Sequence, residues 1–312
     1  MPQSKFVVNN KAPMGLHIRK QPEPTDSTNI LGVLTVNQEV EKLEETPLSD
    51  WWKVSASLNG IPIEGYVNKN YLAEVGENVV VVEHEGVVEV HLPTSGLTVV
   101  RGSKARLAHP LTEIPPVKRQ ANDPPQKRLD AVRQLISWLR VESSLRYRSD
   151  GMTYCNIYAY DYCYLTGAYL PRVWWTGKAL IRLDAGETVP VKYPGSEPGT
   201  VNEKVANELN EWFKDWGPHF GWRQSLDLTE MQDEANQGRV CITVARSKPQ
   251  YHHGHGHIVA VVPENDDQRA IRQNGKVIAT VQSQAGAHNY SYHVNHWWND
   301  GTYSDFGHWI HQ

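Results

Sequence analysis

Residues 252–262 read His-His-Gly-His-Gly-His-Ile-Val-Ala-Val-Val, in which a lead-in of histidine and glycine precedes a continuous apolar run. An apolar run of this length predicts a buried strand, and His257 stands at its first position. Two more strand-like runs flank it, VCITVAR at 240–246 and VIATVQSQAG at 277–286. Because these runs follow helical segments instead of alternating with them, the order of elements predicts an α+β fold.

The helical segments begin at Lys127, where the period of the sequence changes. Residues 161–165 also look helical and end near Gly167, a residue that favours helix termination. Residues 202–212 predict a third helix. The first helix is predicted from apolar residues at helical spacing, namely Leu129, Val132, Leu135, Ile136 and Leu139.

The amino-terminal part has a different pattern. Residues 6–75 alternate apolar and polar side chains in short runs, which predicts several strands and a small barrel. Asn59-Gly60 is a hairpin signal, because both turn positions need positive φ. The run VVVVEHEGVVEVHL at 79–92 predicts two more strands, and a stretch rich in Pro, Gly and charge then predicts a linker. We therefore expect three segments, with boundaries at 1–75, 76–125 and 126–312.

The composition excludes several classes of protein. A net charge of −4 gives no reason to expect nucleic acid as the main partner, which would need a concentrated basic face, and no apolar run is long enough to cross a membrane. The first fifteen residues have no apolar core and no cleavage site, so we expect no Sec signal and either a cytosolic location or another export route. The three cysteines form neither a disulfide framework nor a CxxC pair, which leaves room for a reactive thiol. We expect no cofactor.

Cys155 is the first candidate for chemistry. It lies in Thr153-Tyr154-Cys155-Asn156, just before a helical run. At a helix N-terminus, unpaired N–H groups and the helix dipole favour a thiolate, and the same N–H groups can stabilise an oxyanion. The alternative is a small buried residue, which is the role we expect for Cys163 and Cys241.

His257 is the second candidate. An imidazole on a rigid strand can accept the proton of a thiol, and the nearby glycines leave room for a substrate backbone. Four histidines in residues 252–257 also admit a metal site, with His255 and His257 on one strand face. No Asp or Glu lies among them to complete it, so we expect no bound metal.

Gln282 and Gln284 form the third group, because a period of two puts both on one face of a strand. Either side-chain carbonyl could accept the second ring N–H of the histidine and fix its tautomer. A solvated strand face is the alternative for both. The pairs Trp174-Trp175 and Trp297-Trp298 could line a substrate groove or pack in the core, and Asp161 is expected to be a structural hydrogen-bonding residue.

Taken in chain order, these motifs resemble the NlpC-type and CHAP-type peptidoglycan hydrolases, which have a papain-like domain with helices packed on an antiparallel sheet. Tyr158 near the usual Phe, and the histidine-rich lead-in, depart from the family pattern. The matching residues span about 146–307 and include Arg146-Tyr147, Thr153-Tyr154-Cys155-Asn156-Ile157, Asp161, Gly256-His257-Ile258-Val259 and Gln284-Ala285-Gly286-x-x-Asn289.

That resemblance implies Cys155 as nucleophile, His257 as base and Gln284 as the orienting group, with Gln282 or Asn289 as rivals. We expect the substrate to contact Tyr154, Asn156, Gly256, Gln282 and Trp174.

The amino-terminal residues resemble the bacterial SH3-like domain, which implies binding to a wall peptide or glycan, or a spacer role. His17-Ile18-Arg19 replaces the usual Asn-Val-Arg, and Tyr66 replaces the usual Trp. The match rests on Leu16-His17-Ile18-Arg19, Ile30-Leu31-Gly32-Val33-Leu34, Asp50-Trp51-Trp52-Lys53-Val54, Gly65-Tyr66-Val67 and Tyr71-Leu72.

The two resemblances together predict a monomeric peptidoglycan hydrolase, an endopeptidase or amidase, that acts on the cell wall without nucleic acid or membrane as a partner. A phage endolysin, a secreted effector and a chain without its leader stay open, and an effector would have an inhibitory immunity protein as a further partner. An inactive wall-binding adaptor and a transglutaminase or acyltransferase on the same fold are the rival classes.

Overall fold

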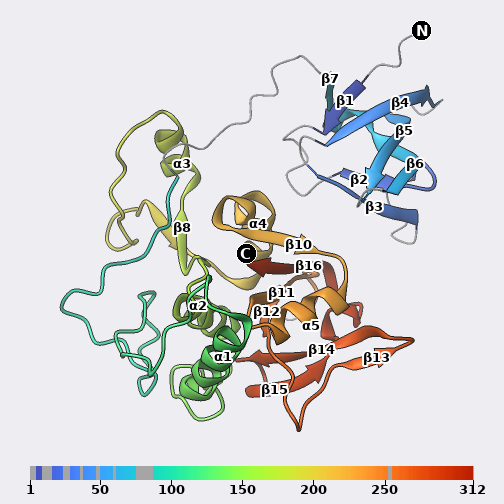
Figure 1. The fold of residues 1–312 in the computed structure, drawn as a ribbon. Helices are drawn as coiled ribbons and strands as arrows, with labels where there is room; N and C mark the ends of the chain where they lie inside the picture. Colours follow the sequence, from blue (N-terminus) through green and yellow to red (C-terminus); the bar gives the residue numbers. More distant parts are fainter. Residues whose placement is uncertain are drawn as a thin grey trace. The chain divides into compact units, whose positions relative to one another are not determined.

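The computed structural model divides the chain into two compact units, Met1–His84 and Glu85–Gln312 (Figure 1). No helix in the described part of the chain combines the length and the apolarity that a bilayer span requires. The residues that the structure describes are 5–8, 16–23, 29–35, 38–46, 50–58, 61–74, 87–251 and 255–311.

The amino-terminal unit is one antiparallel sheet of the order β3-β2-β6-β5-β4-β1-β7. Alternate residues face its core, as Val54 and Ala56 of β5 do. The strands predicted in this unit are therefore confirmed, whereas Asn59-Gly60 lies outside the described residues. The elements are β1 (Lys5–Val8), β2 (Leu16–Arg19), β3 (Ile30–Leu34), β4 (Glu39–Glu45), β5 (Trp51–Leu58), β6 (Ile61–Asn68), the 3₁₀ turn η2 (Lys69–Tyr71) and β7 (Leu72–Glu74).

The carboxy-terminal unit mixes helices with a curled antiparallel sheet of the order β10-β16-β11-β12-β14-β13, and β15 also pairs with β14. The predicted α+β class is confirmed at this level. Its helices are α1 (Pro125–Leu139), α2 (Cys155–Thr166), α3 (Gly177–Asp184), α4 (Ala206–Asp215) and α5 (Leu228–Asn236). Its strands are β8 (Val173–Trp175), β9 (Val201–Glu203), β10 (Trp222–Ser225), β11 (Val240–Ser247), β12 (His257–Val261), β13 (Ile271–Gln273), β14 (Lys276–Gln284), β15 (Tyr290–Asn295) and β16 (Tyr303–His311).

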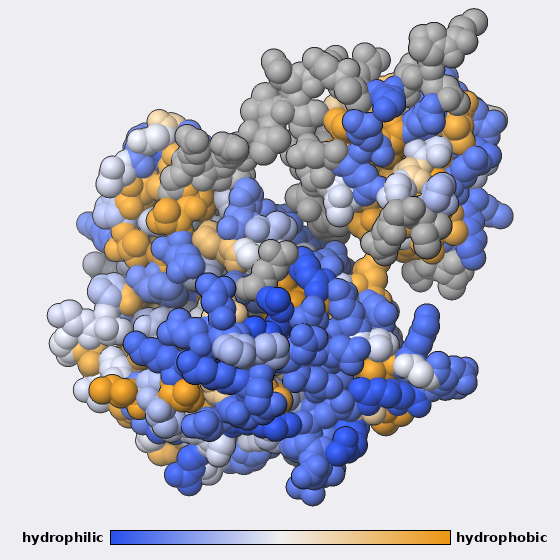
Figure 2. Space-filling view, in the orientation of Figure 1, coloured by the Kyte–Doolittle hydropathy of each residue, from blue (hydrophilic) through white to orange (hydrophobic). Residues whose placement is uncertain are grey.

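The sheet of this unit is covered on both faces. Ile242 and Ile258 belong to the core shared with α1 and α2, while Cys241 and Val261 pack with Met231 and Ala235 of α5. Because both faces are buried, β11 and β12 are continuous apolar runs with no alternation. On the face shown in Figure 2, an apolar area lies over α3, where Ile181 is 71% exposed.

The helix predicted at 202–212 begins later than expected. Val201–Glu203 forms strand β9 and pairs with β8, because the fully buried Val201 packs in the core in extended conformation. The helix starts at Ala206, and the Glu208 carboxylate accepts a hydrogen bond from the N–H of Val205 at 3.1 Å. The end of α2 is as predicted, since Gly167 caps it at φ 76°.

The boundary between the units differs from the predicted one near residue 125. Residues 87–124, which we call the strap, belong to the carboxy-terminal unit. The strap has neither helix nor strand, so the strand predicted for its first residues is wrong; residues 79–86 lie outside the described residues. At its start the N–H of Val90 donates to the Tyr169 hydroxyl at 2.9 Å, in place of a ladder bond. Apolar strap residues also enter the core of the unit, namely Val90, Leu92, Val99, Ala108 and Leu111.

Arginines of the strap bind backbone carbonyl groups of the helical part. Arg101 donates to the carbonyl of Trp138 near the end of α1, and Arg119 donates to that of Thr166, the last residue of α2, at 2.9 Å. The carbonyl groups at helix C-termini have no partner within the helix and carry partial negative charge, so a guanidinium stabilises them. The strap is thus an integral layer of this unit. The linker predicted from its Pro, Gly and charge content is not found.

Candidate functional site

Cys155 is the first residue of α2, directly after Tyr154 at the N-cap. Its side chain is buried, with 5% exposure, and the backbone N–H groups of Ile258, Asn156 and Cys155 itself are directed at the sulfur. Ile258 is the residue after His257 at the start of β12. The fold therefore brings the sulfur to the beginning of the strand that carries the predicted base.

His257 and Gln284 are joined by a hydrogen bond of 2.5 Å between Nε2 and Oε1. Gln284 ends β14, which pairs with β12, and its own Nε2 donates to the carbonyl of His288 at 2.9 Å. That second bond assigns the orientation of the amide, so Oε1 faces the ring and Nε2 of His257 must be the donor. The proton-accepting nitrogen of the imidazole is therefore Nδ1.

Gln282 is fully buried and has a different role from Gln284. Its Nε2 donates to Thr280 Oγ1 and to the carbonyl of Asn295, at 3.0 and 2.8 Å, and its Oε1 accepts the indole N–H of Trp297 at 2.9 Å. The expectation that Gln282 contacts substrate is wrong, because the side chain is enclosed by its own neighbours. Gln282 instead holds Trp297 in place.

Trp297 and Tyr303 form an aromatic wall beside the imidazole; of the pair Trp297-Trp298, for which a groove or the core was expected, Trp297 lies at the site and Trp298 is buried, and Tyr303 was not expected there. The Trp297 ring stands edge to face against His257 at 4.7 Å and against Tyr303 at 4.9 Å. Burial, and then the nearby Asp300 and Cys155, raise the pKa of Tyr303, so it keeps its phenolic proton at neutral pH. The separation of these residues in sequence gave no signal of the contact.

The ionisation of Cys155 is decided by burial. Burial raises the pKa of the thiol to about 11, although the three backbone amides act in the opposite direction. The amides lower the pKa as expected for a helix N-terminus, but desolvation outweighs them, so the net shift is upward. At pH 7 such a group is ionised in about one molecule in 10⁴, so its chemistry requires a proton acceptor.

The residues on either side of Cys155 are held by contacts with other parts of the protein. The Tyr154 hydroxyl donates to Asp150 at 2.5 Å, and Asn156 Nδ2 donates to the carbonyl of Lys204 at 2.9 Å. A Cβ at Gly256 would lie 2.2 Å from the carbonyl oxygen of Ala245, so this glycine serves close packing of the chain and not, as expected, room for a substrate. All three residues border the site, but their side chains or backbone already have partners.

Trp174 does not line the site. It is 4% exposed and packs in an aromatic cluster with Tyr169, Trp212, Trp216 and Phe220. The predicted substrate contact is wrong, because the ring is part of the hydrophobic core.

Asn289 is excluded as the third group, because its side chain is used elsewhere. Oδ1 accepts the N–H of Gly286, and Nδ2 donates to the carbonyls of Val141 and Tyr147. Asn289 thus ties the loop after β14 to the segment before α2.

The other cysteines and Asp161 are structural, as predicted. Cys163 and Cys241 are fully buried. Asp161 is fully buried and accepts two bonds from Arg146, at 2.6 and 3.2 Å, and one from the Tyr147 hydroxyl at 2.9 Å.

The metal hypothesis gains no support from the part of the chain that the structure describes, where no group of three or more His, Cys, Asp or Glu could hold an ion. His252 and His253 lie outside the described residues, and His255 is exposed.

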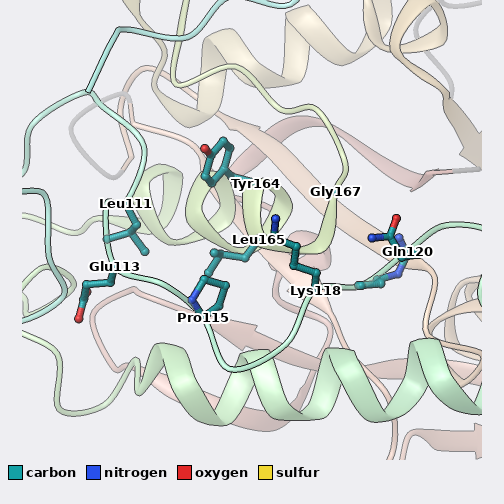
Figure 3. Close-up of a pocket in the computed structure, with 9 residues that line it drawn as sticks. Leu111, Glu113, Pro115, Lys118, Gln120, Tyr164, Leu165 and Gly167 are labelled. Carbon is teal, nitrogen blue, oxygen red and sulfur yellow. The ribbon is translucent and has the colours of Figure 1, made fainter. Parts of the chain in front are cut away.

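A hollow of about 280 Å³ lies at the opposite end of α2, between that helix and the strap (Figure 3). Tyr164, Leu165 and Gly167 line it together with Leu111 and Pro115. Tyr164 follows Cys155 by nine residues, which is about 14 Å along a helix. The hollow is therefore separate from the site around Cys155.

Comparisons with family models, with curated proteins and with solved structures found no match for this chain. The function is therefore argued from the geometry of the site.

Proposed function

We propose that this protein is a cysteine hydrolase that cleaves an amide bond in the stem peptide of bacterial peptidoglycan. The observation that carries the proposal is the convergence of three segments: the sulfur of Cys155 faces the start of β12, and Nε2 of the adjacent His257 is held by Gln284 at 2.5 Å. A nucleophile, a base and a group that orients the base are the parts that thiol catalysis needs. Their order along helix, strand and next strand is that of papain-like hydrolases.

In this mechanism Nδ1 of His257 accepts the proton of Cys155 as the sulfur attacks the amide carbon. The N–H groups at the start of α2 stabilise the oxyanion of the tetrahedral intermediate. The imidazolium then protonates the leaving amine, which leaves a thioester on Cys155 and releases the first product. Water, activated by the neutral imidazole, hydrolyses the thioester and restores the thiol.

The thiol could lose its proton before the attack or during it, and its high pKa favours the second. A preformed thiolate is disfavoured by burial in the free protein, so proton transfer to His257 accompanies attack. Gln284 supports this step, because its carbonyl stabilises the positive charge that His257 acquires.

The choice of peptidoglycan as substrate rests on the family resemblance and on the amino-terminal unit. That unit is a small antiparallel sheet, as an SH3-like wall-binding domain would be. In its core the half-buried Trp52 packs against the buried Phe6 at 4.8 Å, and the Lys42 ammonium lies 4.0 Å from the centre of the Trp52 ring. We assign to it the binding of wall peptide or glycan, with the wall as the site of action.

The test is digestion of purified sacculi by the full chain, followed by mass spectrometry of the released muropeptides. New amino and carboxyl termini within or at the start of the stem peptide are expected, and their position distinguishes endopeptidase from amidase. The variant that tests the proposal is Cys155→Ala, and its matched control is Cys163→Ala. Each removes one thiol, at the first and the last turn of the same helix. Release of the same products by Cys155→Ala would refute the proposal.

A further inference from the structure

Arg106 of the strap lies at the segment that leads into the nucleophile. Its Nε donates to the carbonyl of Arg146 at 3.1 Å, and its Nη2 donates to that of Arg148 at 2.7 Å. Its Nη1 forms an ion pair with Asp150 at 3.0 Å. One side chain thus engages three residues of the chain that approaches Cys155.

The same guanidinium covers the residue that precedes Cys155. The Cζ of Arg106 lies 3.6 Å from the centre of the Tyr154 ring, within cation–π distance. The Tyr154 hydroxyl in turn donates to Asp150 at 2.5 Å. Arg106, Tyr154 and Asp150 therefore form a closed set of contacts, in which each member touches the other two.

This set is well placed to control the start of α2. Tyr154 is the N-cap and has no side-chain hydrogen bond to the helix, so the cap does not fix itself by the usual capping contact. Residues 148–153 are exposed, and Gly151 adopts φ +94°. An exposed loop with a left-handed glycine has little intrinsic preference for one conformation, so contacts with the body of the protein must select it.

The set contains one negative and one positive charge, on Asp150 and Arg106. The Tyr154 hydroxyl and the Arg106 guanidinium lower the pKa of the exposed Asp150 carboxyl, so it is ionised at neutral pH and pairs with the cation. Arg106 itself is largely covered, with 14% exposure of its side chain. A covered guanidinium with bonds to two carbonyls is an anchor with a defined geometry, unlike an exposed ion pair.

We infer that Arg106 is a positioning residue for Cys155: by clamping Tyr154 and the 148–154 segment, it sets the position of the sulfur relative to His257. The inference rests on the proposed function, since it assumes that Cys155 and His257 act as a pair. It gives the strap a role in the proposed reaction that acts through the position of Cys155.

The experiment is a double-mutant cycle on the rate of Cys155 alkylation by iodoacetamide at pH 7, in the full chain. Cys163 and Cys241 are fully buried, and Cys155→Ala gives the background rate. Arg106→Met should lower the rate about 10-fold in the wild-type background, because a small displacement separates thiol and base. In the His257→Ala background the same change should alter the rate less than about twofold, since there is no base left to misalign.

The matched control is Arg101→Met. Arg101 also belongs to the strap, but its side chain stacks on Trp138 at 3.6 Å and pairs with Glu113 at 3.0 Å, both outside the 148–154 segment. It should lower the thermal unfolding temperature without changing the alkylation rate. Arg106→Lys should recover part of the lost rate, because it keeps the charge over Tyr154 but cannot bind both carbonyls.

Two results would overturn the inference. One is an Arg106→Met effect of equal size with and without His257; the other is no effect in the wild-type background. If Arg106→Met does not fold, Asp150→Asn takes its place: Asp150 is at the surface, a rate loss of about threefold that vanishes without His257 supports the inference, and an unchanged rate overturns it.

Failure of the proposed function gives a separate signal. If His257→Ala alkylates as fast as the wild type, the catalytic pair itself is wrong. If sacculi are not cleaved although the Arg106–His257 coupling is present, the pair stands and only the substrate assignment fails.

Discussion

The two ends of helix α2 carry a buried cysteine each, and they differ in what surrounds the sulfur. Cys155 in the first turn faces N–H groups from itself, Asn156 and Ile258. Cys163 in the last turn instead lies near the thiol of Cys241, whose negative charge when ionised would raise the pKa of Cys163 further. Burial raises the pKa of both thiols. Burial alone therefore does not distinguish the two thiols; the backbone amide donors around Cys155 do.

The largest expected difference between the two cysteines is in the hydrolysis of sacculi. Cys155→Ala should lower the hydrolysis of sacculi by at least about 10³-fold, because the thioester step is lost. Cys163→Ala should retain hydrolysis within a few-fold. The measurement is the rate of release of soluble muropeptides at equal protein concentration, and equal losses in the two variants would remove the distinction between the two ends.

The middle of α2 tests whether its buried ion pair is structural. Asp161→Asn should destabilise the protein by about 3–5 kcal/mol in denaturant unfolding, because the charge of Arg146 then stays buried without its partner. The matched control is Glu187→Gln, which breaks the half-exposed pair with Arg182 and should cost less than about 1 kcal/mol. Similar losses in the two variants would contradict the buried pair's role.

The pH dependence of alkylation tests whether Cys155, unlike Cys163, is assisted by a base. With the pKa of Cys155 raised to about 11, the thiolate fraction without a base rises tenfold per pH unit until that value. His257→Ala should thus be about 100-fold slower than the wild type at pH 7, and the two rates should converge as the pH approaches 11. Parallel profiles over the whole range would show that His257 does not assist the thiol.

The smallest effect concerns stability at the carboxyl end of α2. Cys163→Ala removes a fully buried sulfur and should cost about 1–2 kcal/mol in the free energy of unfolding. The change should be independent of Cys155, which the double variant with Cys155→Ala can verify by additivity. A neutral result would mean that the core closes over the missing atom.

Much of the local structure was predictable from sequence, because short-range patterns encode it. Alternation located the strands of the amino-terminal unit, and Gly167 marked the end of α2. The period of two also placed Gln282 and Gln284 on one face. It could not tell that Gln282 lies at full depth while Gln284 ends the strand beside His257, since depth depends on the neighbouring strands.

The packing of the strap and the contact between Trp297 and His257 could not be predicted from sequence patterns, although the Trp297-Trp298 pair itself was noticed. The strap is held by arginines that bind backbone carbonyls at distant positions, as Arg119 binds Gly238 at 2.7 Å, and every residue type offers such carbonyls. Trp297 contacts His257 across forty residues of sequence. The upward shift in the pKa of Cys155 was not predicted either, because the helix terminus was visible in the sequence and the desolvation was not.

Gly256 has a consequence for the tolerance of the site to mutation. A single methyl group there would collide with the carbonyl of Ala245 and with Asn207 Oδ1, which would lie 2.4 Å away, and Ala245 is the residue paired with His257. Selection for activity from a library randomised at this codon should therefore return glycine alone. Positions 256 and 257 are therefore expected to vary together or not at all, because a side chain at position 256 would push the chain away from Ala245 and displace His257 with it.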